Sequence, residues 1–191
     1  MSLFDAQGQR LYLTPSEREQ FCQATDHVSK DKRMLGLMLA NTGCRISEGL
    51  SVKVKDIDFS SGAVTFRSLK QRKSNVYRQV PLSDDYLKSL DNAYDLRLLQ
   101  KRSKPRNEYI WGWSRQYGHA IIKEIMAIAG LQGIAATPKG LRHAFAIACL
   151  DKSVPLNMVQ KWMGHARLEN TVIYANAMGH EERNLAARLW S

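Results

Sequence analysis

Apolar residues recur at helical spacing in several stretches of the chain, and residues that favour helix starts or helix ends flank these stretches. Thr14 and Glu17 have the spacing of a capping box, and Pro15 suits a first helical position, so a helix is predicted to start here. Gly43 and Gly164 mark predicted helix ends. A helical turn is predicted from about residue 45, and a helix is predicted to begin at residue 137. The other predicted helices cover residues 32–41, 83–98, 114–130, 156–163, 171–175 and 180–190.

Between residues 52 and 82 the pattern changes to short apolar alternation. A turn at Ser60-Ser61-Gly62 precedes a predicted strand over 63–67, and a second strand is predicted over 76–82, with Val80 and Leu82 on one side. The basic stretch between the two strands is then the loop of a β-hairpin or meander. We expect a mainly α fold with a small antiparallel β-sheet, an α+β domain.

Length and composition exclude several classes of protein. A chain of 191 residues with 44% hydrophobic content is long enough for one domain with its own core. Its apolar runs are too short for a membrane helix, and the first residues do not resemble a signal peptide. The 3 cysteines and 5 histidines have no metal-binding or redox spacing. We therefore expect reduced thiols in the cytoplasm and no structural metal.

The net charge of +10 is concentrated in two segments. Residues 67–78 hold five basic residues and 101–106 hold four, with no acidic residue in either, which leaves 19 basic against 18 acidic residues elsewhere. A solvated loop is the plain interpretation of each segment, and a contact surface for a polyanion such as nucleic acid is the functional one. The nine residues are Arg67, Lys70, Arg72, Lys73, Arg78, Lys101, Arg102, Lys104 and Arg106.

The predicted helix start at Thr137-Pro138 carries two cations on one face. Lys139 and Arg142 are three residues apart, close to the free N–H groups and the positive dipole end of the helix. This arrangement favours a phosphate, although two ordinary surface cations would give the same pattern.

Four segments together resemble the tyrosine recombinase, or phage integrase, family of site-specific DNA recombinases. They are TGCRISEGL at 42–50, RSLKQRKSNVYRQVPL at 67–82, TPKGLRHAFA at 137–146 and WMGHARLENTVIYA at 162–175. The resemblance implies the catalytic-domain fold over 14–191, with a tail helix over 180–191 and a short arm over 1–13. Most members carry a separate DNA-binding domain before the catalytic one. Here none is expected, so the chain is either a minimal form or a fragment.

The resemblance also implies roles for individual residues. Tyr174 matches the nucleophile, and Arg45 and Arg142 match the two arginines that clamp the phosphate, for which planar guanidinium groups are suited. His165 matches a residue that hydrogen-bonds the same phosphate. Lys70 best matches the hairpin lysine that protonates the leaving oxygen, with Arg72 and Lys73 as nearby rivals. Surrounding cations are expected to favour the phenolate of Tyr174.

Glu48, Lys139 and His143 complete the set. Glu48 matches the acidic residue that orients the first arginine. Position 139 is most often histidine in the family, and a lysine ammonium has no lone pair with which to accept the tyrosine proton. We therefore expect Lys139 to stabilise charge in the transition state, while water or the phosphate removes the proton. His143 also matches the family pattern and is interpreted as a supporting or structural residue.

The implied activity is DNA strand transfer through a covalent 3′-phosphotyrosyl intermediate, with neither cofactor nor metal. Its partners would be double-stranded DNA carrying recombination sites and further copies of the chain in a tetramer, in the cytoplasm and on the nucleoid, not at a membrane. The tail over 180–190 would dock on a neighbouring copy or pack on its own domain. The alternatives are a catalytically silent DNA-binding regulator, a type IB topoisomerase and, from another class, an RNA-binding module, for which no motif is found.

The two basic segments generate a prediction. Neutralising Arg72, Lys73, Lys101 and Arg102 should flatten the dependence of DNA affinity on salt, by about 0.9 in the log–log slope for each DNA phosphate that the variant no longer neutralises. Titrations at several salt concentrations measure this slope. An unchanged slope would mean that these charges are only solvated surface.

Overall fold

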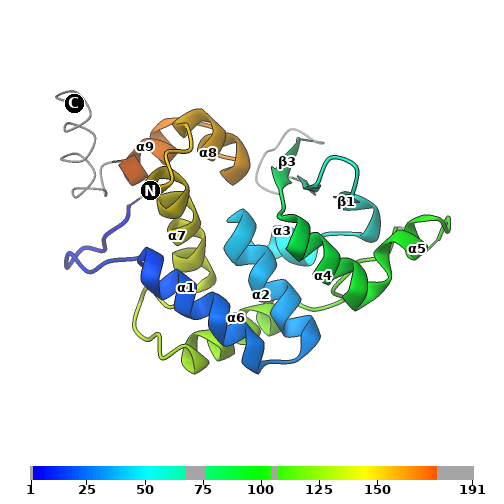
Figure 1. The fold of residues 1–191 in the computed structure, drawn as a ribbon. Helices are drawn as coiled ribbons and strands as arrows, with labels where there is room; N and C mark the ends of the chain where they lie inside the picture. Colours follow the sequence, from blue (N-terminus) through cyan, green and yellow to red (C-terminus); the bar gives the residue numbers. More distant parts are fainter. Residues whose placement is uncertain (1, 68–75, 105–106, 176–191) are drawn as a thin grey trace, which may run out of the picture.

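The computed structural model describes residues 2–67, 76–104 and 107–175, which form a helical body with a small three-stranded sheet at one side (Figure 1). The mainly α fold with a small antiparallel sheet is therefore confirmed. The α-helices are α1 (Pro15–Ala24), α2 (Lys30–Thr42), α3 (Ile46–Leu50), α4 (Asp84–Tyr94), α5 (Leu96–Gln100), α6 (Arg115–Ile128), α7 (Pro138–Asp151), α8 (Leu156–Met163) and α9 (Glu169–Ala175). Short 3-10 turns are η1 (Thr25–His27) and η2 (Val54–Asp56), and the strands are β1 (Ile57–Asp58), β2 (Ala63–Arg67) and β3 (Tyr77–Pro81).

Four of the predicted helix starts are confirmed by their capping hydrogen bonds. At α1 the Thr14 hydroxyl accepts the Glu17 N–H (3.2 Å), and the Glu17 carboxylate accepts the Thr14 N–H (2.7 Å). Each bond satisfies a donor that the helix itself leaves free. Side-chain caps of the same kind begin α4, α6 and α7, at Ser83, Ser114 and Thr137.

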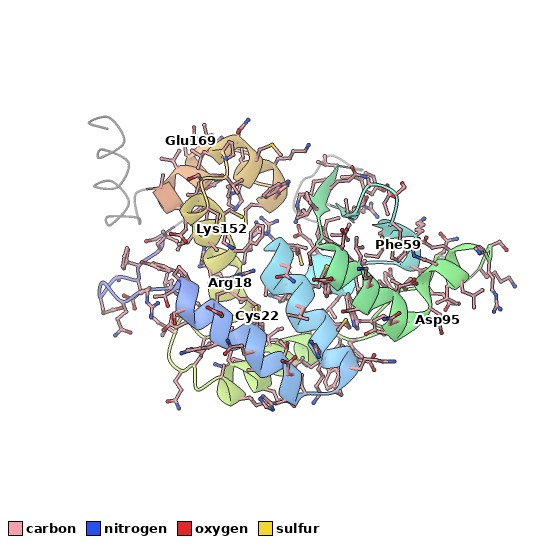
Figure 2. The ribbon with its side chains drawn as sticks, in the orientation of Figure 1. Arg18, Cys22, Phe59, Asp95, Lys152 and Glu169 are labelled. Carbon is pink, nitrogen blue, oxygen red and sulfur yellow. The ribbon has the colours of Figure 1, made fainter. Side chains whose placement is uncertain are left out.

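The single helix predicted over 83–98 is wrong, because the chain breaks at Asp95. This residue adopts a left-handed conformation (φ 52°), and it lies at the end of α4 (Figure 2). The Asp91 carboxylate accepts the backbone N–H of Arg97 at 2.9 Å and also pairs with the Arg97 guanidinium. The break buries Leu96 completely and leaves Leu98 52% exposed, so the apolar spacing through Leu98 does not belong to one helix face.

The three strands form an antiparallel sheet in the order β1-β2-β3. Val64 lies opposite Val80, and Phe66 lies opposite Arg78. The apolar side chains of these pairs are buried, which fixes the register of the hairpin. Strand β3 packs against α8, and β2 packs against α3. The basic loop predicted between β2 and β3 lies outside the described residues, as does the tail over 180–191.

Helix α7 connects two apolar clusters. Its Leu141 and Ala144 belong to the main core, in which α7 packs against α1 and α2 (Figure 1). Its Phe145 and Cys149 belong to a smaller cluster, formed with α8, α9 and the segment before α1. The buried members of the smaller cluster are Leu3, Phe145, Ala146, Ile147, Cys149, Val159, Met163 and Tyr174. Residues from three other chain segments thus share this cluster with the candidate nucleophile, Tyr174. None of the helices in the described ranges is long and apolar enough to cross a membrane.

The start of α7 lies so close to the preceding loop that only glycine fits at position 140. A Cβ on Gly140 would collide with the carbonyl of Ala135. Gly140→Ala is therefore expected to lower the free energy of unfolding by about 1–3 kcal/mol, the usual range for overpacking, as measured by chemical denaturation. Gly112→Ala is the matched control, because nothing lies within 4 Å of a Cβ there. Equal losses in the two variants would contradict the prediction.

Candidate active site

Gly43 ends α2 and directs the chain into α3. Its left-handed conformation (φ 59°) lets its N–H donate to the Leu39 carbonyl at 3.0 Å. A side chain at this position would be strained and would also collide with the ring of Phe145 on α7. The close approach of α2 to α7 brings Arg45, the N-cap of α3, next to the residues of α7.

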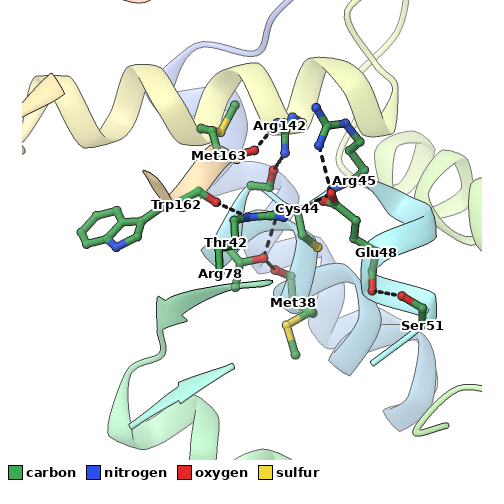
Figure 3. A network of polar contacts seen from close by, with 11 residues as sticks. Met38, Thr42, Cys44, Arg45, Glu48, Ser51, Arg78, Arg142, Trp162 and Met163 are labelled. Carbon is green, nitrogen blue, oxygen red and sulfur yellow. Dashed lines mark hydrogen bonds and ion pairs between the residues drawn. The ribbon is translucent and has the colours of Figure 1, made fainter. Parts of the chain in front are cut away.

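Glu48 is the centre of the polar network shown in Figure 3. Its carboxylate is fully buried and accepts hydrogen bonds from two arginines: Arg45 Nη1 at 2.9 Å and Arg78 Nη2 at 2.7 Å. It also accepts the backbone N–H of Arg45 at 2.8 Å. Burial raises the pKa of Glu48, but the two guanidinium groups and the backbone bond outweigh burial and hold the pKa below its usual value. Glu48 thus contacts Arg45, the arginine that it is expected to orient.

Arg78 lies in this network and not on the surface. It is 8% exposed, its Nε donates to the Trp162 carbonyl at 2.8 Å, and its guanidinium lies 5.0 Å from the centre of the Phe66 ring. The expectation that Arg78 contacts DNA from an exposed loop is therefore wrong, because its guanidinium is engaged by groups inside the protein. Arg78 instead connects β3 to Glu48 on α3 and to the end of α8.

Arg142 is buried beside the same group of arginines. Its guanidinium donates to the Gly43 carbonyl and, at 2.6 Å, to the Met163 carbonyl. These two carbonyls belong to the ends of α2 and α8, so Arg142 fixes the two helix ends relative to α7. Burial and the charge of Arg45 lower the pKa of Arg142 to about 10, which leaves it protonated at neutral pH.

His165 follows Gly164, which ends α8 in the left-handed region (φ 64°) as predicted. His165 Nδ1 lies 3.0 Å from the hydroxyl of Thr171 on α9, and its Nε2 is buried without a hydrogen-bond partner among the described residues. If the hydroxyl donates to Nδ1, the proton of the ring is on Nε2. Burial, together with the charges of Arg142 and Arg45, lowers the pKa of His165 to about 3, so the ring is neutral.

Tyr174 is fully buried between the two histidines. Its ring is stacked on that of His165, with 6.2 Å between centroids and 8° between planes, and its hydroxyl lies 2.8 Å from His143 Nδ1. Burial raises the pKa of Tyr174 to about 12, although Arg142 and Arg45 act in the opposite direction. The cations thus favour the phenolate as expected, but loss of solvent is the larger effect in this closed arrangement, and the phenol is protonated at neutral pH.

A cavity of about 250 Å³ opens beside His165, between β3 and α8. Among the described residues, its lining combines neutral and cationic groups without a carboxylate. The residues are Val76, Tyr77, Arg78, Asn157, Gln160, Lys161, Gly164 and His165. An anion could approach the network from this side without meeting a negative charge from the lining.

Comparison with known proteins identifies the family. The model of the phage integrase family matches residues 11–181. The chain belongs to the phage integrase, or tyrosine recombinase, family. The resemblance noted in the sequence is thereby confirmed.

Two curated relatives in this family are similar over most of the chain. Tyrosine recombinase XerD of Neisseria meningitidis serogroup A is 34% identical over 158 residues, which cover 80% of this chain and 52% of the relative. Tyrosine recombinase XerA of Pyrococcus furiosus is 29% identical over 170 residues, 82% of this chain and 54% of the relative. The chain thus spans about half the length of these relatives.

Solved structures of family members have the same fold. A crystal structure of XerA recombinase superposes with a TM-score of 0.75 at 24% identity, over 94% of this chain and 65% of the other. The XerH recombinase bound to its difH substrate in a pre-cleavage complex superposes with a TM-score of 0.74 at 23% identity, over 98% of this chain and 60% of the other. At these identities the likeness concerns the fold alone.

The structure brings together only part of the site expected for a tyrosine recombinase. Arg45, Glu48, Arg142, His165 and Tyr174 lie in one cluster. Lys139 is exposed in the first turn of α7, and Arg67 is exposed at the end of β2. Lys101, Arg102 and Lys104 are exposed after α5, at the opposite end of the molecule from α9 (Figure 1). Lys70, Arg72, Lys73 and Arg106 lie outside the described residues. No group of three or more potential metal ligands occurs in the described ranges.

Sequence reasoning did not place Arg78 or Thr171 in this cluster, and it gave His143 only a supporting or structural role. His143 carried a usable signal, because it lies four residues after Lys139 and so shares its helix face. Thr171 carried a weaker one, since it lies three residues before Tyr174 in the predicted short helix. No local pattern distinguishes Arg78 from the other basic residues near the hairpin.

Glu48 generates a stability prediction. Glu48→Gln removes the charge that compensates Arg45 and Arg78, so we expect a loss of about 3–5 kcal/mol in the free energy of unfolding at neutral pH. Because the folded pKa of Glu48 is lowered, its contribution is complete above the unfolded pKa of about 4.3 and is lost as the pH falls toward the folded pKa. The difference between native protein and variant should therefore shrink below about pH 4 in denaturant titrations.

The matched control for this titration is Glu124→Gln. Glu124 pairs with Lys32 at 2.7 Å, but its side chain is 44% exposed. Such surface pairs contribute about 0–1 kcal/mol. A loss at Glu48 no larger than at Glu124, or one that does not change with pH, would contradict the prediction.

Proposed function

We propose that this chain is the catalytic part of a site-specific DNA recombinase. In this proposal the Tyr174 hydroxyl attacks a DNA phosphodiester, forms a 3′-phosphotyrosyl bond and releases a 5′-hydroxyl. A 5′-hydroxyl of a partner strand then attacks the same bond, so the bond energy is conserved. The observation that carries the proposal is the placement of the Tyr174 phenol among His143, His165 and the arginines at positions 45 and 142.

The charge of the network supports binding of a phosphate. Three guanidinium groups and one carboxylate meet there, which leaves two positive charges in a buried place. A pentavalent phosphate gains negative charge as it forms, and fixed positive groups in a buried site stabilise that charge strongly. Arg45 has the most accessible side chain of the three, at 26% exposure, and His165 Nε2 has no hydrogen-bond partner in the described ranges.

The other assigned roles extend this proposal. Lys139 adds charge at the start of α7, and Lys70 protonates the leaving 5′ oxygen. Family relatives such as the Tn1549 transposon integrase have been solved in complex with DNA. We infer that this chain also acts on double-stranded DNA, on the nucleoid and as several copies in one complex. The exposed cations at 67 and at 101–104 would contact the DNA backbone outside the site.

Cleavage requires a change around α9. The hydroxyl of Tyr174 is buried and engaged with His143, so it reaches a phosphate only after the elements that cover it have shifted. A DNA-binding regulator without activity would need no such change. The two functions therefore differ in whether Tyr174 ever reaches DNA.

A covalent trapping assay separates the two functions. The protein is incubated with a nicked suicide duplex carrying its recombination site, taken from a library of candidate sites, and adducts are resolved by denaturing electrophoresis. We expect an adduct from the native chain and from Tyr117→Phe, an exposed tyrosine of α6, but none from Tyr174→Phe. The absence of an adduct on every site that the protein binds would leave only the regulator.

A further inference from the structure

His143 is the direct hydrogen-bond partner of the candidate nucleophile. It lies on α7, is fully buried, and has Nδ1 2.8 Å from the Tyr174 hydroxyl. Its Nε2 is buried without a partner among the described residues, and the Tyr174 hydroxyl has no other hydrogen-bond partner there. The two rings are 5.6 Å apart between centroids. The arrangement provides a path for one proton between two defined atoms.

The proposed cleavage reaction requires an acceptor for that proton. Residue 139 is a lysine, and its ammonium group has three donors and no lone pair. His165 is turned toward Thr171 through its Nδ1, and it faces Tyr174 with the plane of its ring. Within the described residues, His143 Nδ1 is therefore the nitrogen placed to accept the proton.

We propose that His143 is the general base that removes the phenolic proton of Tyr174. The inference rests on the proposed function. As Tyr174 Oη bonds to phosphorus, its proton moves to His143 Nδ1, and the imidazole becomes an imidazolium. The bond from phosphorus to the 5′ oxygen breaks, and that oxygen leaves as a hydroxyl with a proton from the general acid of the proposed function. When the strand is rejoined, the phenolic oxygen takes the proton back from His143.

The charges around His143 are consistent with this role. Burial, together with the positive charges of Lys139 and Arg142, lowers the pKa of His143 to about 4, so the ring holds a free lone pair at neutral pH. Tyr174 and the neutral His165 face it from the other side. A bound phosphate adds negative charge that opposes the two cations. The phenol itself becomes far more acidic as its oxygen bonds to phosphorus, which drives the proton toward the ring.

The test uses single-turnover cleavage of the suicide duplex by the whole 191-residue chain. His143→Gln keeps a similar volume and a hydrogen-bonding group but cannot accept the proton. We expect its cleavage rate at neutral pH to fall about 10²–10⁴-fold, the usual contribution of a general base, with unchanged DNA affinity. The loss should decrease as the pH rises, because hydroxide then forms the phenolate. His119→Gln, at an exposed position of α6, is the matched control and should retain the native rate.

A second series separates proton removal from simple positioning. Fluorinated tyrosine at position 174 has a more acidic phenol, and it should restore the rate of His143→Gln more than it changes the rate of the native chain. A loss that stays the same at every pH and with every tyrosine analogue would assign His143 to positioning only and overturn the proposal. Native cleavage with an unaffected His143→Gln would also overturn it while the proposed function stands. A native chain that forms no adduct removes both.

If His143→Gln does not fold, the native chain gives an independent test. With ¹⁵N-labelled histidine, NMR reports which ring nitrogen of His143 carries the proton. The proposal requires Nδ1 without a proton and Nε2–H in the resting protein. A proton on Nδ1 would overturn it.

Discussion

The buried carboxylate of Glu48 is the interaction on which the arrangement of the site depends. Arg45 and Arg78 bind it directly, and Arg142 lies close enough for their charges to influence one another. Like charges brought this close in a place with little water repel strongly, and a buried charge without a partner costs several kcal/mol. The Glu48 carboxylate reduces the repulsion among the three arginines. The positive charge that it does not compensate is available to bind an anion.

Carbonyl groups at helix ends provide the rest of the support. The last carbonyls of a helix have no partner within the helix and carry partial negative charge. Arg142 donates to Gly43 and Met163, and Arg78 donates to Trp162, so the ends of α2 and α8 are fixed by the arginines of the site. The same arginines therefore hold the helix ends in place and provide the positive charge of the site. In this region a substitution aimed at chemistry will also alter the packing of helices.

Local features of the sequence predicted most of the helices and the hairpin, whereas the candidate site residues came from the family resemblance. Caps such as Thr14 and breaks such as Gly164 act within one turn of chain, so their effects can be inferred from neighbours. The break at Asp95 could not be predicted in this way. It depends on tertiary packing, which buries Leu96 and leaves Leu98 exposed. The position of Arg78 depends on Glu48, 30 residues away, and that of His143 on Tyr174, 31 residues away. Such contacts exist only once the chain has folded.

The smaller apolar cluster has a consequence for how activity and stability are related. Its buried members include Tyr174, so the group that would react is also part of the packing that holds α7, α8 and α9 together. Exposing the phenol means giving up some of this packing, and the free energy of that local opening adds to the barrier of the reaction. Leu3, Phe145 and Met163 are apolar members of the same cluster, so they contribute to the free energy of that local opening. Under the proposed function, tighter packing around Tyr174 is therefore expected to slow cleavage.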